Sequence, residues 1–151
     1  MLLRWGLVGL LLGLMGCQTR PMKAWDLSQP GWLVREVPAA WRPEASAPEL
    51  TGELMVAQHR DGARFIQFSK QGVPVVTARS DAAGWELNSA LRKGGYRYPG
   101  RPPGRLVWFH VDGLPPSQPA AGSGWALTVD AEGGWILDDP RRGERLEAAA
   151  P

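Results

Sequence analysis

The residues that could do acid–base or metal chemistry in this chain are two histidines and a pair of adjacent aspartates. His59 lies beside an expected hairpin turn and His110 lies inside an aromatic segment; neither has a partner at the spacing of a metal site or a catalytic triad. Asp138 and Asp139 are neighbours on an expected strand, so their side chains point to opposite faces and cannot share a substrate. We therefore expect no enzymatic activity, no metal site and no cofactor, and for His110 a half-buried, hydrogen-bonded structural role.

The only cysteine, Cys17, follows an apolar run near the N-terminus. Arg4 precedes the run Trp5–Met15, whose 11 residues fall short of the roughly 20 that span a bilayer. This pattern predicts a signal peptide over residues 1–16. The run ends in Leu14-Met15-Gly16-Cys17, which resembles the bacterial lipobox. That resemblance implies a diacylglyceryl group on the thiol of Cys17 and a further acyl chain, such as palmitate, on its new amino terminus; an ordinary signal peptide with an incidental cysteine is the alternative.

A lipid anchor would settle where the mature protein works. With one cysteine the chain can form no internal disulfide, and an unpaired thiol is a liability in an exported protein unless it is modified. Several acyl chains hold a protein at a membrane essentially permanently. Gln18 stands where an aspartate would favour retention in the inner membrane. We therefore expect an outer-membrane lipoprotein on the periplasmic face.

Composition and charge exclude several classes of protein. Hydrophobic residues make up 44% and charged residues 21% of the chain, which is typical of a globular domain and argues against disorder and against a polytopic membrane protein. The formal net charge is only +2, with no basic stripe suited to nucleic acid. The most basic stretch, residues 92–105, is interrupted by glycines and prolines and predicts a solvated loop; contact with anionic lipid headgroups is the alternative.

Residues 17–49 are expected to form the lipidated N-terminus, a tether and an irregular covering segment. Prolines recur at positions 21, 30, 38, 43 and 48, which leaves no room for a long helix. Trp25, Trp32 and Trp41 are large aromatics that an exposed linker would not carry. We expect them to cover one side of the main sheet; lining a lipid pocket or touching the bilayer surface is the other possibility.

Residues 50–147 are expected to form the folded β domain, followed by a short tail at 148–151. Short alternating segments separated by turn residues predict about seven strands in an antiparallel meander, because the connections are too short for parallel crossovers. The strands are expected at residues 50–58, 64–69, 73–79, 85–89, 106–112, 124–130 and 135–138, with loops at 94–104 and 113–122.

Some of these strands are apolar on both faces. Val107, Phe109 and Val111 alternate with Leu106 and Trp108, so neither side of that segment suits water. A mainly β fold that curls into an incomplete barrel with a hydrophobic trough would satisfy this pattern; a closed barrel or sandwich without a cavity is the alternative. The walls of the trough are predicted to be Leu54, Val56, Ile66, Phe68, Val107, Phe109, Trp125 and Leu127.

Part of the chain resembles a known family. The segments are Arg105-Leu106-Val107-Trp108, Gly113-Leu114-Pro115-Pro116 and Gly133-Gly134-Trp135-Ile136. They are similar to the C-terminal half of the LolA/LolB-like lipoprotein-localisation fold, particularly its membrane-anchored acceptor. The lipobox and the start of the first strand, Gly52-Glu53-Leu54, fit the order of that acceptor. The resemblance implies an incomplete barrel whose cavity receives the acyl chains of lipoproteins and passes them to a membrane without covalent chemistry.

Two functions follow as expectations. The first is a membrane-anchored, non-catalytic lipoprotein that binds acyl chains or lipoproteins in a hydrophobic concavity. The second is an envelope interaction or structural lipoprotein that docks a protein partner through sheet edges or through its tryptophan-rich leading segment and carries no lipid.

Overall fold

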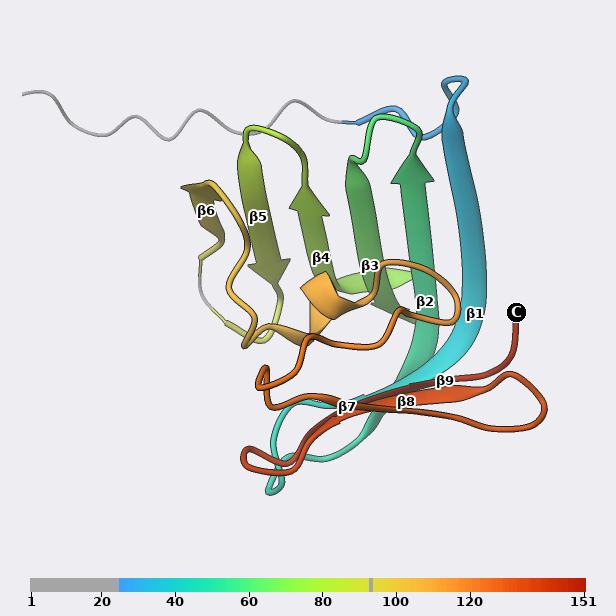
Figure 1. Cartoon of the computed structure of the whole chain (residues 1–151), viewed down its shortest axis with the longest axis vertical. Coiled ribbons are helices and arrows are strands. Elements are labelled where there is room, and N and C mark those ends of the chain that lie inside the picture. Colours follow the sequence, from blue (N-terminus) through green and yellow to red (C-terminus); the bar gives the residue numbers. More distant parts are fainter. Residues whose placement is uncertain (1–24, 93) are drawn as a thin grey trace, which may run out of the picture.

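The computed structural model describes residues 25–92 and 94–151, and it shows a single antiparallel sheet (Figure 1). Within these residues the sheet has nine strands in the order β6-β5-β4-β3-β2-β1-β9-β8-β7. The strands are β1 Trp32–Arg42, β2 Leu50–His59, β3 Arg64–Lys70, β4 Val73–Ser80, β5 Gly84–Ser89, β6 Tyr96–Pro99, β7 Ala126–Val129, β8 Trp135–Asp139 and β9 Glu144–Ala148. A short 3-10 turn, η1, covers Val107–His110.

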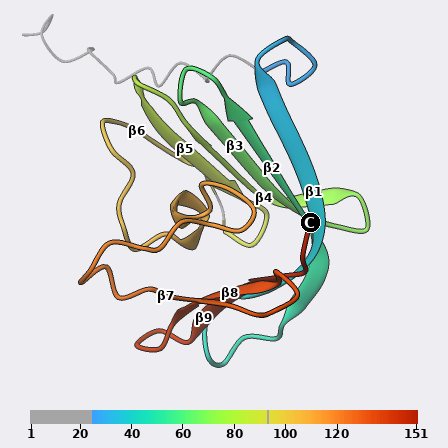
Figure 2. The ribbon, with the colours of Figure 1, turned by 45° about the vertical axis from the view of Figure 1, so that its right-hand side comes forward.

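The sheet is bent and remains open. Figure 2 shows β2–β6 as one arm and β7–β9 as a second arm, with β1 continuing from the first into the second. The edge strands β6 and β7 are at opposite ends of the strand order and do not pair with each other. The predicted fold class, a curved antiparallel sheet forming an incomplete barrel, is therefore confirmed.

The meander from β2 to β5 forms as the sequence predicts. Each connection is a tight turn, and the first one places Gly62 at φ 93°, a backbone conformation that side chains disfavour. Asp61 supports this turn by accepting a hydrogen bond from the backbone N of Ala63 at 3.0 Å. The strands expected near 124–130 and 135–138 also form, as β7 and β8.

The leading segment corrects the prediction of an irregular cover. Residues 32–42 form β1, which pairs with β2 along nearly its whole length and with β9 from Ala39 to Arg42. In an antiparallel strand the N–H and the C=O of one residue point to the same side. The Pro38 carbonyl accepts a hydrogen bond from Ala149 N, just beyond the stretch of β1 that pairs with β9, so the N–H that proline lacks would also point to that side and away from β2. No hydrogen bond to β2 is lost, and the proline does not interrupt the strand.

Residues 106–112 were expected as a strand and instead contain η1. Its backbone bonds are local, for example from Phe109 N to the Leu106 carbonyl at 3.2 Å. Val107, Trp108 and Val111 are all buried, because the segment packs inside the bend of the sheet. A segment that is apolar at consecutive positions can be buried as a compact turn or as a strand, so its hydrophobic pattern does not distinguish the two.

Besides β1, two further strands, β6 and β9, were not predicted; with the loss of the strand expected at 106–112, these three additions give the described sheet nine strands and not about seven. β6 lies inside the expected loop 94–104, and all four of its residues are exposed. β9 consists of helix-favouring residues, Glu-Arg-Leu-Glu-Ala, but Leu146 and Ala148 are buried between β1 and β8. Pairing on both sides overrides the local preference of β9.

The core lies on the concave face of the sheet. The register places Val37, Leu54, Phe68 and Val76 side by side across four strands, and residues 106–114 cover them from inside the bend. Trp108 from η1 meets Trp41 at 4.9 Å and Phe68 at 6.1 Å between ring centroids. Aromatic pairs at such distances each add about 0.5–1.5 kcal/mol beyond the area that they bury.

Candidate functional site: an aromatic cleft

The predicted trough residues form the core of the protein. Leu54, Val56, Ile66, Phe68, Val107 and Trp125 are at most 7% exposed, and Phe109 and Leu127 are partly buried against the same cluster. The structure therefore brings all eight together in one hydrophobic cluster. However, none of them lines the large cleft described below, because residues 106–114 fill the space in front of the sheet.

An open cleft remains beside that filling, along β5 and β6. Its volume is about 830 Å³, within the usual range for small-molecule sites. Its walls come from the β1–β2 loop, from β4 to β6, from residues 103–108 and from the loop before β9. The aromatic lining residues are Trp41, Trp85, Tyr96, Tyr98 and Trp108, and the aliphatic ones include Val76, Leu87, Leu91 and Leu106.

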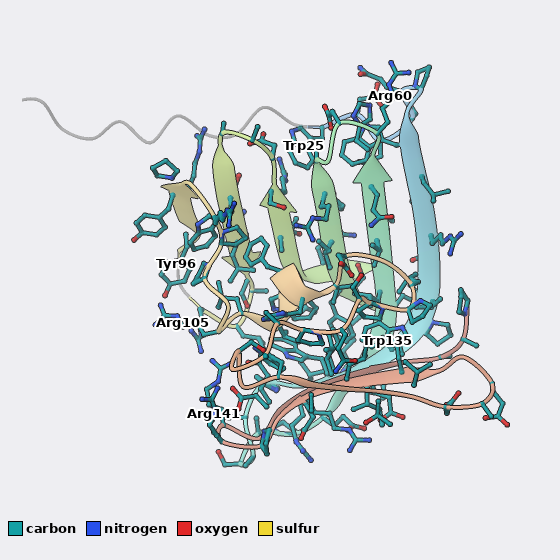
Figure 3. All side chains as sticks on the ribbon, in the orientation of Figure 1. Trp25, Arg60, Tyr96, Arg105, Trp135 and Arg141 are labelled. Atoms are coloured by element: carbon teal, nitrogen blue, oxygen red, sulfur yellow. The ribbon has the colours of Figure 1, made fainter. Side chains whose placement is uncertain are left out.

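The aromatic rings stand in fixed positions. Trp85 contacts both Tyr98 and, edge-to-face, Phe109, each at 5.4 Å between ring centroids. Tyr96 and Tyr98 alternate along β6 and are 44% and 55% exposed. Figure 3 shows Tyr96 and Arg105 on the same side of the molecule. The cleft thus combines a buried indole floor with an exposed tyrosine rim.

Charged groups surround the opening. Arg92, Arg105, Arg142, Glu44 and Glu144 line the cleft, which gives it one excess positive charge. The Arg142 guanidinium contacts the Glu144 carboxylate at 3.2 Å and the buried Asp139 carboxylate at 2.9 Å, and it lies over the Trp125 ring. The Arg105 side chain makes no hydrogen bond or ion pair with the described residues, so its charge is available to a ligand.

The two carboxyls that share Arg142 differ in pKa. Burial alone would raise the pKa of Asp139, but hydrogen bonds from Arg142 and Arg141 hold it below its usual value. Burial raises the pKa of Glu144, and the hydrogen bond from Trp41 Nε1 at 3.3 Å together with the Arg142 charge offsets only part of that effect. Glu144 is the more weakly stabilised anion, and it lines the cleft.

A second depression, of about 420 Å³, lies beside β4 and β5. It is lined by proline, valine, threonine, asparagine, serine, alanine and glycine residues, with no aromatic or charged side chain. It offers no group that would fix a ligand, and we do not consider it a site.

The histidines have structural contacts. His59 Nδ1 lies 2.8 Å from Asp61, and its ring packs on Trp32 at 5.0 Å. His110 is half-buried and its Nε2 lies 2.7 Å from the Gly104 carbonyl, which is the half-buried, hydrogen-bonded setting expected for it. No group of three or more histidine, cysteine, aspartate or glutamate residues in the described part of the chain is placed to hold a metal ion.

The predicted signal peptide and Cys17 lie outside the described residues. Within residues 25–92 and 94–151, no helix has the length and apolarity that crossing a membrane requires. The segments that resemble the LolA/LolB-like fold lie in the part that is described: residues 105–108 lead into η1, residues 113–116 form a loop, and residues 133–136 begin β8.

The cleft residues were largely missed by sequence reasoning. The sequence predicts a strand at Leu106 and Trp108 and a loop at Tyr96 and Tyr98, and for Trp41 it favours a covering role, with the lining of a lipid pocket as the alternative. The alternation Tyr96-x-Tyr98 was the one local signal that could have revealed β6 and its aromatic rim. The cleft itself joins five separate parts of the chain, which local patterns do not report.

Comparison with known proteins identifies no relative. No protein-family model, no curated protein and no solved structure matches this chain. The resemblance to the LolA/LolB-like fold therefore stays a prediction.

Proposed function

We propose that this protein is a lipoprotein, anchored through Cys17 at the periplasmic face of the outer membrane, that binds the acyl chains of lipids or lipoproteins in the aromatic cleft without catalysing a reaction. The cleft is the observation that carries the proposal. Its volume of about 830 Å³ and its aromatic and aliphatic walls suit a hydrocarbon chain. Covering about fifteen methylenes would favour binding by roughly 10 kcal/mol at most, before the costs of ordering.

The charged rim supports an amphiphilic ligand. The chain of an acyl ligand would lie against Trp85, Leu87 and Leu106, while its polar end would remain near the arginines at the opening. Because the core behind the cleft is already packed, the ligand would not have to displace buried side chains. The cleft therefore takes the place of the trough predicted from the sequence.

Binding can be measured with a fluorescent fatty acid. The chain from Gln18 onward contains all nine described strands, so it can be studied in solution without acyl groups. We expect a saturable rise in fluorescence that palmitate reverses. Leu91 lines the cleft and is 53% exposed, so L91D should weaken binding at least tenfold without unfolding the protein. Val73 is 64% exposed and lies outside the cleft, which makes V73D the matched control.

The outcomes separate the two functions expected from the sequence. Saturable binding that L91D removes and V73D leaves intact supports acyl-chain binding. Absence of saturable binding, or equal effects of L91D and V73D, would overturn it and leave the docking of a protein partner as the working hypothesis. Mass spectrometry of the protein from membranes would test the anchor, since it should find acyl groups on Cys17.

A further inference from the structure

One end of the sheet differs from the other in its surface chemistry. This near end consists of residues 25–31, the β2–β3 turn and the β4–β5 turn, which the register places together because Trp32 pairs with His59 and Arg64 pairs with Ser80. Figure 3 shows Trp25 and Arg60 at this end. The far end carries the β1–β2 loop, residues 43–49, and the β5–β6 connection.

Aromatic and aliphatic side chains are concentrated at the near end. Trp25 packs on Trp32 at 5.4 Å, and both remain partly exposed. The Arg79 guanidinium lies 6.0 Å from the Trp25 ring. Leu33 and Val34, which follow on β1, are 53% and 43% exposed. Tryptophan, exposed aliphatic residues and arginine are the residue types that settle at the boundary between lipid headgroups and hydrocarbon.

The position of the anchor points to the same end. Only seven residues, Gln18 to Ala24, separate the predicted acylation site, Cys17, from Trp25, so the two residues are eight Cα–Cα steps apart. Even fully extended, they reach about 26–29 Å, so Trp25 cannot move farther than that from the bilayer that holds the acyl chains. Arg20 and Lys23 within this stretch add two positive charges beside the headgroups.

We propose that the near end, centred on Trp25, Trp32 and Leu33, rests on the headgroup layer of the membrane in which Cys17 is anchored. This orientation depends on the anchoring proposed above. Exposed acids at the same end, among them Asp26, Asp61 and Asp81, balance its arginines, so the contact depends on aromatic and apolar groups more than on charge.

The orientation determines where the cleft opens. β1 runs from the near end to the far end over 11 residues, which corresponds to about 30 Å. The cleft runs along β5 and β6, from Trp85 and Tyr98, which pair close to the near end, to Pro43 and Glu44 of the far-end loop and Leu91 after β5. With the near end on the lipid, the far-end part of the cleft faces the aqueous compartment, and an acyl ligand from a soluble donor can enter there.

The test uses the full lipidated protein in vesicles of phosphatidylethanolamine with a minority of phosphatidylglycerol. Cys17 is the only cysteine, and acylation blocks its thiol, so a single introduced cysteine can be labelled with a fluorophore. The positions are Ala82 in the near-end β4–β5 turn and Ser46 in the far-end loop, both exposed. A headgroup spin-labelled phospholipid serves as the quencher.

We expect several-fold stronger quenching of the label in A82C than of the label in S46C. Adding L33D should reduce quenching at position 82, whereas V129D, at a residue of similar exposure on β7, should not. Equal quenching, stronger quenching at position 46, or no quenching at either position would overturn the proposed orientation.

The two proposals fail in different ways. If mass spectrometry finds no acyl group on Cys17, the anchor is wrong and the orientation fails with it. If Cys17 is acylated and position 82 is not the more quenched, only the orientation is wrong. If the fatty acid does not bind but position 82 is quenched, the cleft function fails and the orientation stands.

Discussion

Arg142 supports two carboxyls that stand in different surroundings. Asp139 also accepts hydrogen bonds from the backbone N and the Nε of Arg141, at 3.1 and 3.3 Å, and these keep its buried charge stable. Glu144 has one ion pair and one long hydrogen bond from Trp41, and burial prevails. The first carboxylate holds the β8–β9 turn by accepting hydrogen bonds from Arg141 N and Arg142 Nε, whereas the second brings a charge to the wall of the cleft.

The raised pKa of Glu144 predicts how stability depends on pH. In the unfolded chain this carboxyl has its ordinary pKa of 4.5, so it ionises at a lower pH there than in the folded protein. Its contribution to the free energy of unfolding therefore falls as the pH rises from 4.5 through the raised folded pKa, and then levels off. In E144Q this loss is absent, while the amide oxygen can still accept the hydrogen bond from Trp41.

The measurement is the difference in the free energy of unfolding between wild type and E144Q, from urea titrations at several pH values between 4 and 8. Taking the difference removes the opposite contribution of Asp139, whose lowered pKa stabilises the protein until the pH falls below its ordinary 3.8. E147Q, at an exposed carboxyl on the same strand, should follow wild type. A difference that grows in favour of wild type as the pH rises would contradict the assignment.

At the scale of elements, β2 and β3 approach each other closely at Gly52. A Cβ there would overlap the Ser69 carbonyl, beside the shift in register between Phe68 and Ser69. G52A should therefore force the strands apart and cost about 1–3 kcal/mol, as overpacking usually does. Equilibrium denaturation would measure it. T51V, a shape-conserving change at the exposed neighbour, should stay within about 0.5 kcal/mol of wild type. Equal stabilities of G52A and T51V would show that the strands can separate freely.

The elements that sequence reasoning found differ physically from those it missed. β2 to β5 are joined by short turns with glycine, so their partners follow directly in the chain and local patterns suffice. β1 and β9 pair although about a hundred residues separate them, and only that pairing explains why Pro38 and the helix-favouring residues of β9 are accepted. The core residues were foreseen because alternation reports burial, whereas the cleft depends on where η1 settles.

At the scale of the molecule, one core connects the two arms of the sheet. Trp41 lies on the part of β1 that is shared by both arms. Its ring is 6.0 Å from that of Phe68 in the β2–β6 arm, and its backbone is paired with Leu146 in the β7–β9 arm. Residues 106–114 then pack against both. Neither arm has a core of its own, so unfolding either arm would expose the apolar core residues of the other.

This continuity predicts a single cooperative unit. Leu137 of β8 and Ile66 of β3 are both fully buried, one in each arm, and replacing either by alanine should cost about 2–5 kcal/mol. Hydrogen exchange of the slowest amides would then report the same loss in both arms, whichever residue is replaced. V129A, at an exposed position of β7, should leave protection in β3 unchanged. If L137A lowered protection only in β7 to β9, the arms would be separate units, and the cleft between them would open and close without unfolding the core.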